Sequence, residues 1–190
     1  MLEWHLHGTV LRISLWFPAA VIAMLSLDTE GITVLCLIAS LIHEGGHAAA
    51  MLLLGDAPAR VTLNAFGMCV ERRRGETLGY GSLCAVSLAG PLVNAVCAAV
   101  LPATAAAVHG VLALFHLLPV LSLDGGEALY YFLCRYTSEE RALRTVYILS
   151  AAIAVPLTAF GAYLFAYNGN FTLLVVCFYL ILRMFLRKGH

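Results

Sequence analysis

Charge is scarce in this chain of 190 residues. Asp, Glu, Lys and Arg together make up 12% of the sequence, whereas an average soluble domain carries roughly 25%. Apolar residues account for 62% of the chain, and the mean hydropathy is +0.90. Such a composition argues against a disordered chain and against a soluble globular domain, because too little polar surface is present to face water. It places the chain in a lipid bilayer.

A basic excess and paired cysteines are lacking as well. The 11 basic and 11 acidic residues give a formal net charge of zero, so nothing points to a nucleic-acid partner. None of the six cysteines forms a C-x-x-C pair, which argues against a zinc ribbon or a disulfide framework. We expect the cysteines to be small packing residues.

Six apolar runs approach or exceed the roughly 20 residues that cross a bilayer core. They cover residues 10–27, 31–54, 82–108, 110–133, 145–167 and 171–186. Between the second and third runs, apolar and other residues alternate in part of the stretch 58–81, which predicts two short strands with a turn near Phe66 and Gly67. The predicted fold is therefore an all-α polytopic membrane protein with about six transmembrane helices and a small β-hairpin or re-entrant segment between helices two and three.

The positions of the basic residues predict the orientation of these spans. The linkers around 28–31, 109–110 and 168–170 contain no Lys or Arg, and all 11 basic residues fall on the other side. They are Arg12, Arg60, Arg72, Arg73, Arg74, Arg135, Arg141, Arg144, Arg183, Arg187 and Lys188. By the positive-inside rule, we expect a multi-pass protein of the cell membrane with both termini in the cytoplasm. His109 falls in an outer linker and receives no predicted role.

The second apolar run contains the pattern H-E-x-x-H, formed by His43, Glu44 and His47. Positions i and i+4 share one face of a helix, so both imidazoles can reach one metal ion. Glu44 stands beside them as the expected general base. The alternative, a pair of packing histidines, is disfavoured because an unpaired glutamate in hydrocarbon costs several kcal/mol.

A catalytic zinc takes three protein ligands and keeps an open position. The fourth apolar run offers Asp124, followed by Gly125 and Gly126. If both spans are helical throughout, His43, His47 and Asp124 lie at depths of about 17, 22 and 21 Å. That depth is past the midplane, toward the cytoplasm. A helix cap at the glycine pair is the alternative role for Asp124.

Three motifs together resemble the site-2 protease family of intramembrane zinc metalloproteases. They are H-E-x-x-H at 43–47, A-G-P-x-x-N at 89–94, and Leu118-Pro119 followed by L-D-G-G at 123–126. The layout is similar to the compact six-span branch, which includes the protease that processes a sporulation sigma factor. We therefore expect residues 1–190 to form a single intramembrane metalloprotease domain without a PDZ or CBS domain.

The resemblance also implies roles for individual residues. One zinc ion per chain would be bound by His43, His47 and Asp124. Glu44 would be the catalytic base, and Asn94 would lie near the active site and contact substrate. A strand within 61–70 would pair with an extended substrate.

Two positions depart from the family pattern. His116 stands where the family usually has Asn, and it could bind substrate or the oxyanion, or compete for the metal. Gly45 stands where a bulkier apolar residue is common, and adjacent glycines permit a close approach by another helix. Breaks at Gly90-Pro91, at Pro119 and at the Gly125-Gly126 pair would admit water to the metal.

The predicted function is zinc-dependent cleavage of a peptide bond within or near a transmembrane segment, as in regulated intramembrane proteolysis. The expected partners are a transmembrane protein substrate, a regulatory membrane protein and the lipid bilayer. Two alternatives stay open. A catalytically inactive relative that binds membrane proteins is favoured only by His116. A metal or proton transporter would need polar residues across the outer half of spans two and four, which offer only Thr33, Ser40 and His116.

Overall fold

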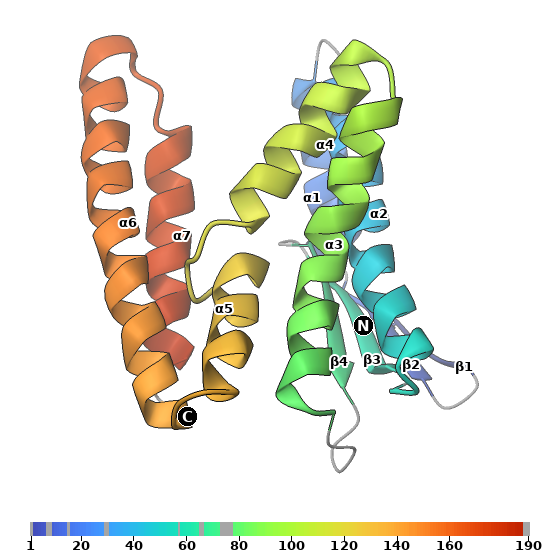
Figure 1. Cartoon of the computed structure of the whole chain (residues 1–190). Helices are drawn as coiled ribbons and strands as arrows, with labels where there is room; N and C mark the ends of the chain where they lie inside the picture. Colours follow the sequence, from blue (N-terminus) through green and yellow to red (C-terminus); the bar gives the residue numbers. More distant parts are fainter. Residues whose placement is uncertain are drawn as a thin grey trace. The chain divides into compact units, whose positions relative to one another are not determined.

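The computed structural model describes residues 2–6, 9–14, 16–28, 31–56, 58–64, 67–72 and 78–187. The chain divides into two compact units, Met1–His116 and Leu117–His190. Over the described residues, the first unit contains four strands and four helices, and the second contains three helices (Figure 1). The expectation of a single protease domain stays a prediction.

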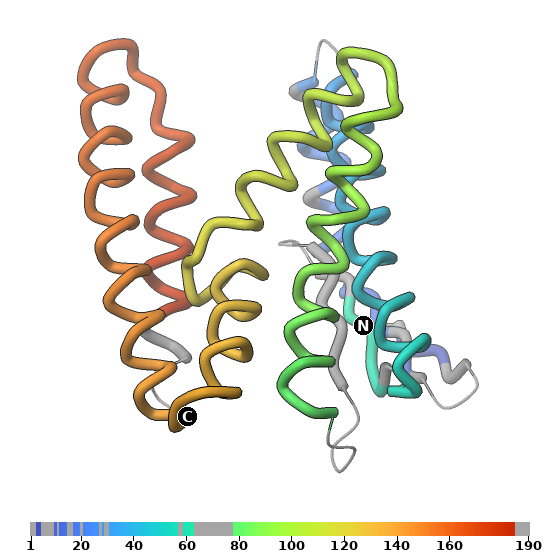
Figure 2. The backbone as a smooth tube through the Cα atoms, viewed as in Figure 1, coloured from blue at the N-terminus to red at the C-terminus, as the bar shows by residue number. Residues whose placement is uncertain are grey.

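The first unit is built on helices α1 (Trp16–Leu27), α2 (Ile32–Leu53), α3 (Tyr80–Val100) and α4 (Ala103–His116). Helix α3 packs against both α2 and α4, as the backbone trace in Figure 2 shows. The third apolar run, predicted to extend to residue 108, breaks earlier. Leu101 is extended, with φ −87° and ψ 162°, because a residue that precedes proline is disfavoured in the α conformation.

A four-stranded sheet completes the first unit. Its strands are β1 (Leu2–Leu6), β2 (Thr9–Ile13), β3 (Pro58–Asn64) and β4 (Gly67–Arg72), in the order β1-β2-β3-β4. The β3–β4 pair is antiparallel and confirms the predicted hairpin, while β2 and β3 run parallel. The sheet contacts α2 through β3 and β4.

The N-terminal hairpin corrects the prediction that the first span begins at residue 10. Residues 9–13 form β2, so helix α1 starts only at Trp16. Glu3 and Arg12 face each other in the β1–β2 register and form an ion pair of 2.6 Å. Cross-strand pairs of opposite charge stabilise such a register, and the alternation of apolar and polar residues was the sequence signal for it.

The second unit consists of α5 (Asp124–Cys134), α6 (Glu139–Asn168) and α7 (Thr172–Arg187). Helix α6 packs against α5 and α7. The buried hydroxyl of Ser150 on α6 accepts a hydrogen bond from the Leu121 amide at 2.8 Å and donates one to the Val146 carbonyl at 2.7 Å. The hydrogen bond from Leu121 connects the segment that precedes α5 to the middle of α6.

The apolar run 110–133 is not one helix, and the predicted break at Pro119 is present. Helix α4 ends at His116, and residues 117–123 are not helical before α5 begins at Asp124. A rise of 1.5 Å per residue does not hold across such a segment, so the depth given for Asp124 loses its basis. Proline at 119 removes a backbone donor and disfavours the helical conformation at Leu118.

Three helices in the described part of the chain are long and apolar enough to cross a membrane, namely α2, α3 and α6. Shorter apolar helices cover Phe17–Ser26, Ala103–His116 and Thr172–Met184. Large apolar side chains point outward from them, including Leu114 at 72% exposure and Val155 at 69%. The mostly helical class with six apolar helices and a small strand element is thus confirmed.

Candidate metal centre

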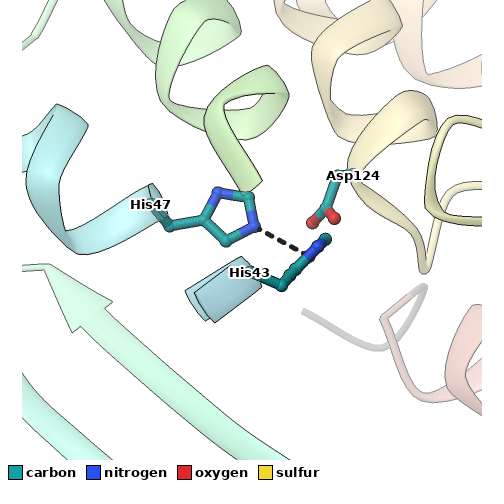
Figure 3. Close-up of side chains that lie close together, drawn as sticks. All are labelled: His43, His47 and Asp124. Atoms are coloured by element: carbon teal, nitrogen blue, oxygen red, sulfur yellow. Dashed lines mark hydrogen bonds between the residues drawn. The ribbon is translucent and has the colours of Figure 1, made fainter. Parts of the chain in front are cut away.

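Two histidines of α2 lie side by side against α3. His43 and His47 are one helical turn apart, and their Nε2 atoms are 3.2 Å from each other (Figure 3). The rings meet edge to face, with centroids 4.8 Å apart and an interplanar angle of 79°. His43 is buried. The predicted pairing of the two imidazoles on one helix face is therefore present in the fold.

The backbone of α3 fixes the tautomer of His47. Its Nδ1 atom lies 2.8 Å from the carbonyl oxygen of Val86. A carbonyl only accepts hydrogen bonds, so His47 Nδ1 carries the proton and donates it. In the neutral ring the Nε2 atom of His47 consequently holds a lone pair, which faces the Nε2 atom of His43.

Asn94 of α3 connects this pair to a third histidine. Its Nδ2 atom is 3.1 Å from His43 Nδ1, and its Oδ1 atom is 2.9 Å from His109 Nδ1 on α4. Asn94 is fully buried and His109 is 3% exposed. The hydrogen bond places Asn94 beside His43 within the first unit, and its place near an active site stays a prediction. Contact between Asn94 and a substrate stays a prediction.

The sequence did not predict a role for His109, because hydropathy places it in an outer linker. It lies inside α4, buried and hydrogen-bonded to Asn94. A signal was available: His109 stands in a run of apolar residues, and ionisable residues in such runs are costly and tend to be functional.

Gly90 gives the two histidines room at α3. A methyl group at this position would lie 2.9 Å from His43 Nε2 and 2.8 Å from His47 Cε1, and closer still to His47 Nε2. Any side chain here would displace the histidine pair. The predicted break at Gly90-Pro91 is wrong, since α3 continues through both residues as one helix.

His116 also reaches the histidine pair. It is the last residue of α4, and its ring centroid lies 4.3 Å from that of His43, tilted by 60°.

Glu44 follows His43 on α2 and is half-buried. Successive helical residues are about 100° apart around the axis, so the Cβ atom of Glu44 leaves α2 at a different angle from that of His43.

Asp124 belongs to the second unit, where it is the first residue of α5. The cap position is taken by Leu123, and no side chain forms a cap hydrogen bond there. Asp124 is therefore not the N-cap residue that the alternative reading proposed. A carboxylate in the first helical turn is favoured by the helix dipole.

The histidine pair fits a tetrahedral metal ion. Two imidazole nitrogens at 2.0–2.1 Å from a zinc ion are about 3.3 Å apart, and the two Nε2 atoms are separated by 3.2 Å. The other ring nitrogen of each histidine is held by a hydrogen bond, to Val86 on one side and Asn94 on the other. Metal-binding histidines are usually oriented by such outer partners.

Fold and site define a class: an apolar helical protein with a buried histidine pair suited to a metal ion. In structure the chain is similar to the site-2 protease from Methanocaldococcus jannaschii, with a TM-score of 0.67 over 94% of this chain and 91% of that one. Sequence identity is 16%, so the likeness shows the fold, which is the fold that the sequence motifs implied. No family model and no curated protein matches the sequence.

Proposed function

We propose that the chain is a zinc-dependent endopeptidase that cleaves a peptide bond within or near a transmembrane segment of a membrane protein. The observation that carries the proposal is the pair His43 and His47, whose Nε2 atoms face each other at 3.2 Å. Gly90 leaves space for both rings beside α3, and the outer ring nitrogens are held by Val86 and Asn94, as is usual for metal-binding histidines. The site-2 protease fold supports the same assignment.

The proposed ligands of one zinc ion are His43, His47 and Asp124. Each offers one ligand atom, two imidazole nitrogens and one carboxylate oxygen. Three protein ligands of this kind leave an open position, as catalytic zinc sites do. When bound, zinc supplies a water of lowered pKa and polarises the scissile carbonyl.

Glu44 and His116 carry out the proton transfer and the substrate contact in this proposal. Glu44, adjacent to His43 on α2, takes the proton of the attacking water and later delivers it to the leaving amine. His116 lies against the His43 ring and donates a hydrogen bond to the substrate carbonyl. In this proposal Asn94, held beside His43, lies close enough to the metal site to contact the substrate.

The sheet offers a place for an extended substrate. In the order β1-β2-β3-β4, strand β3 is paired on both sides, whereas among the described strands β4 pairs with β3 alone. Within the predicted 61–70 region, the edge that could accept a further strand is therefore that of β4. A transmembrane helix must unwind to pair there, so we expect substrates with weak helix formers near the cleavage site.

We further propose that the apolar helices span the cell membrane several times, with both termini and the active site toward the cytoplasm. The outward-facing apolar side chains of α4 and α6 support burial in lipid. The distribution of Lys and Arg supports the orientation. We expect the regulatory partner to be a membrane protein that acts through the membrane-embedded helices.

Cleavage of model transmembrane peptides by the purified chain in lipid tests the proposal. The panel pairs a peptide carrying Gly or Asn at its centre with the same peptide carrying Ala and Leu. We expect zinc-dependent cleavage of the first, at least 10-fold slower cleavage of the second, and a loss of about 10²–10⁴-fold in Glu44→Gln. Equal cleavage by Glu44→Gln would contradict the assignment. Zinc binding without cleavage of any peptide would favour the inactive relative.

A further inference from the structure

We infer that Asn94 and His109 form a reversible hydrogen-bond relay that determines which nitrogen of His43 carries its proton. Both are positioning residues, and they act on the metal through His43. This inference rests on the proposed zinc site. It rests on three contacts within the first unit: His109 Nδ1 to Asn94 Oδ1, Asn94 Nδ2 to His43 Nδ1, and His43 Nε2 to His47 Nε2.

The direction of these hydrogen bonds follows from the fixed end of the chain. The Val86 carbonyl holds the proton of His47 on Nδ1, so Nε2 of the neutral ring is an acceptor. His43 must then donate from Nε2 and accept at Nδ1 from the Asn94 amide nitrogen. The Asn94 oxygen in turn accepts the Nδ1–H of His109. With this assignment, every donor of the relay points toward His47.

Metal binding requires the opposite arrangement at His43. A neutral imidazole that binds zinc through Nε2 carries its proton on Nδ1. Asn94 must then present its oxygen to His43, and its amide nitrogen turns toward His109. His109 must accept at Nδ1 and carry its proton on Nε2. Each of the two rings gives up one proton to water and takes up one, so the number of bound protons is unchanged.

The chemistry of the outer partners explains why the relay acts on one ligand only. His47 faces a backbone carbonyl, a permanent acceptor, and is therefore always in the metal-binding tautomer. His43 faces an amide, which can donate or accept depending on which way it is turned. Asn94 is fully buried and His109 is 3% exposed, and an unsatisfied buried polar group is costly. The two residues must therefore reverse together.

Zinc affinity, measured by competition with a chromogenic chelator, tests the relay on the full chain. Asn94→Leu removes the acceptor, and we expect zinc to bind about 10–100-fold more weakly. Asn94→Asp supplies a permanent acceptor for His43 Nδ1–H and should bind zinc at least as tightly as wild type. His109→Leu should weaken binding by a smaller factor, and His109→Asn, which keeps a polar atom at the position of Nδ1, should restore it.

Ser87→Ala is the matched control. Ser87 is also a buried polar residue of α3, but its hydroxyl donates only to the Leu83 carbonyl of the same helix at 3.1 Å. Its zinc affinity should equal that of wild type. If Asn94→Leu binds zinc as tightly as Ser87→Ala does, the relay is overturned while the zinc site stands. If wild type binds no zinc, the proposed function fails, and the relay fails with it.

Nitrogen NMR of histidine-labelled protein reports the tautomer of His109. A purely structural role of His109 would leave this tautomer unchanged when zinc binds. The His109 signals are identified by their absence in His109→Asn. We expect the protonated nitrogen of His109 to change from Nδ1 to Nε2 when zinc is added to the wild type. An unchanged tautomer upon saturation with zinc would overturn the relay, even if the Asn94→Leu variant did not fold.

Discussion

Two pairs of adjacent glycines lie next to proposed metal ligands, and their surroundings differ. In α2, a methyl group at Gly46 would lie 2.9 Å from the Ala89 carbonyl oxygen, while one at Gly45 would meet nothing within 4 Å. In α5, both glycines are enclosed. A methyl group at Gly125 would lie 2.7 Å from the Leu118 oxygen, and one at Gly126 2.7 Å from the Leu121 nitrogen.

The same dipeptide therefore serves two different packing arrangements. In the first unit, one glycine lets two continuous helices touch along their backbones, which brings the imidazoles of α2 against α3. In the second unit, both glycines let the non-helical segment 117–123 fold back over the first turn of α5, where Asp124 begins the helix. Substituting each glycine by alanine separates these cases, because the same methyl group is added every time.

Gly126→Ala should have the largest effect on stability. The added methyl group would overlap the Val120 carbonyl, which is backbone and cannot rotate aside. Overpacking of this kind costs about 3 kcal/mol or more. Thermal unfolding in detergent should show a marked drop in Tm, with Gly45→Ala as the control that adds the same group in open space. Unchanged stability would mean that segment 117–121 does not lie on α5.

Gly90→Ala should abolish zinc binding while the helices remain. The methyl group on α3 would push against the Nε2 atoms of His43 and His47, which face it from α2. We expect at least a 100-fold loss of zinc affinity, since both ligands are displaced, with a far-ultraviolet circular dichroism spectrum like that of wild type. Leu92→Ala, an exposed position of the same helix, is the control. Normal zinc binding in Gly90→Ala would contradict the geometry of the pair.

Gly46→Ala should be moderately destabilising. The clash with the Ala89 oxygen is partly offset because alanine favours the helix over glycine by about 1 kcal/mol. With an overpacking cost of about 1–3 kcal/mol, the net loss should be about 0–2 kcal/mol. Unfolding of this variant beside wild type measures it, and a gain in stability would show that α2 and α3 are farther apart than described.

Gly45→Ala should stabilise the protein by about 1 kcal/mol, the helix-propensity term alone. Nothing within 4 Å opposes the methyl group. A small rise in Tm with unchanged zinc affinity is the expected result. If Gly45→Ala lost as much stability as Gly46→Ala, Gly45 would not lie in open space and the two positions would not differ in packing.

Much of the helical framework could be predicted from the sequence, because apolar runs of bilayer length leave few other folds. The histidine pair was also predictable, since its i, i+4 spacing places both imidazoles on one face. The non-helical stretch 117–123 was predictable in part, since Pro119 indicated a break, but its length was not. Hydropathy alone does not distinguish one long helix from two short ones.

The outer partners of the histidines were the least predictable part of the site. The Val86 carbonyl has no sequence signature, because any residue at that position would present the same group. His109 is 15 residues from Asn94 in the chain, and only the packing of α4 against α3 brings them together. Strand β2 pairs with β3 across a long separation in sequence, which local alternation alone does not reveal.

The metal content of the purified chain tests the central claim most directly. Wild type, His43→Ala, Asp124→Ala and Glu44→Gln would be purified in detergent without chelators, and their metals measured by mass spectrometry. We predict about one zinc per chain in wild type and Glu44→Gln, and none in the two ligand variants. Wild type without bound metal, or with zinc that persists in His43→Ala, would contradict the account.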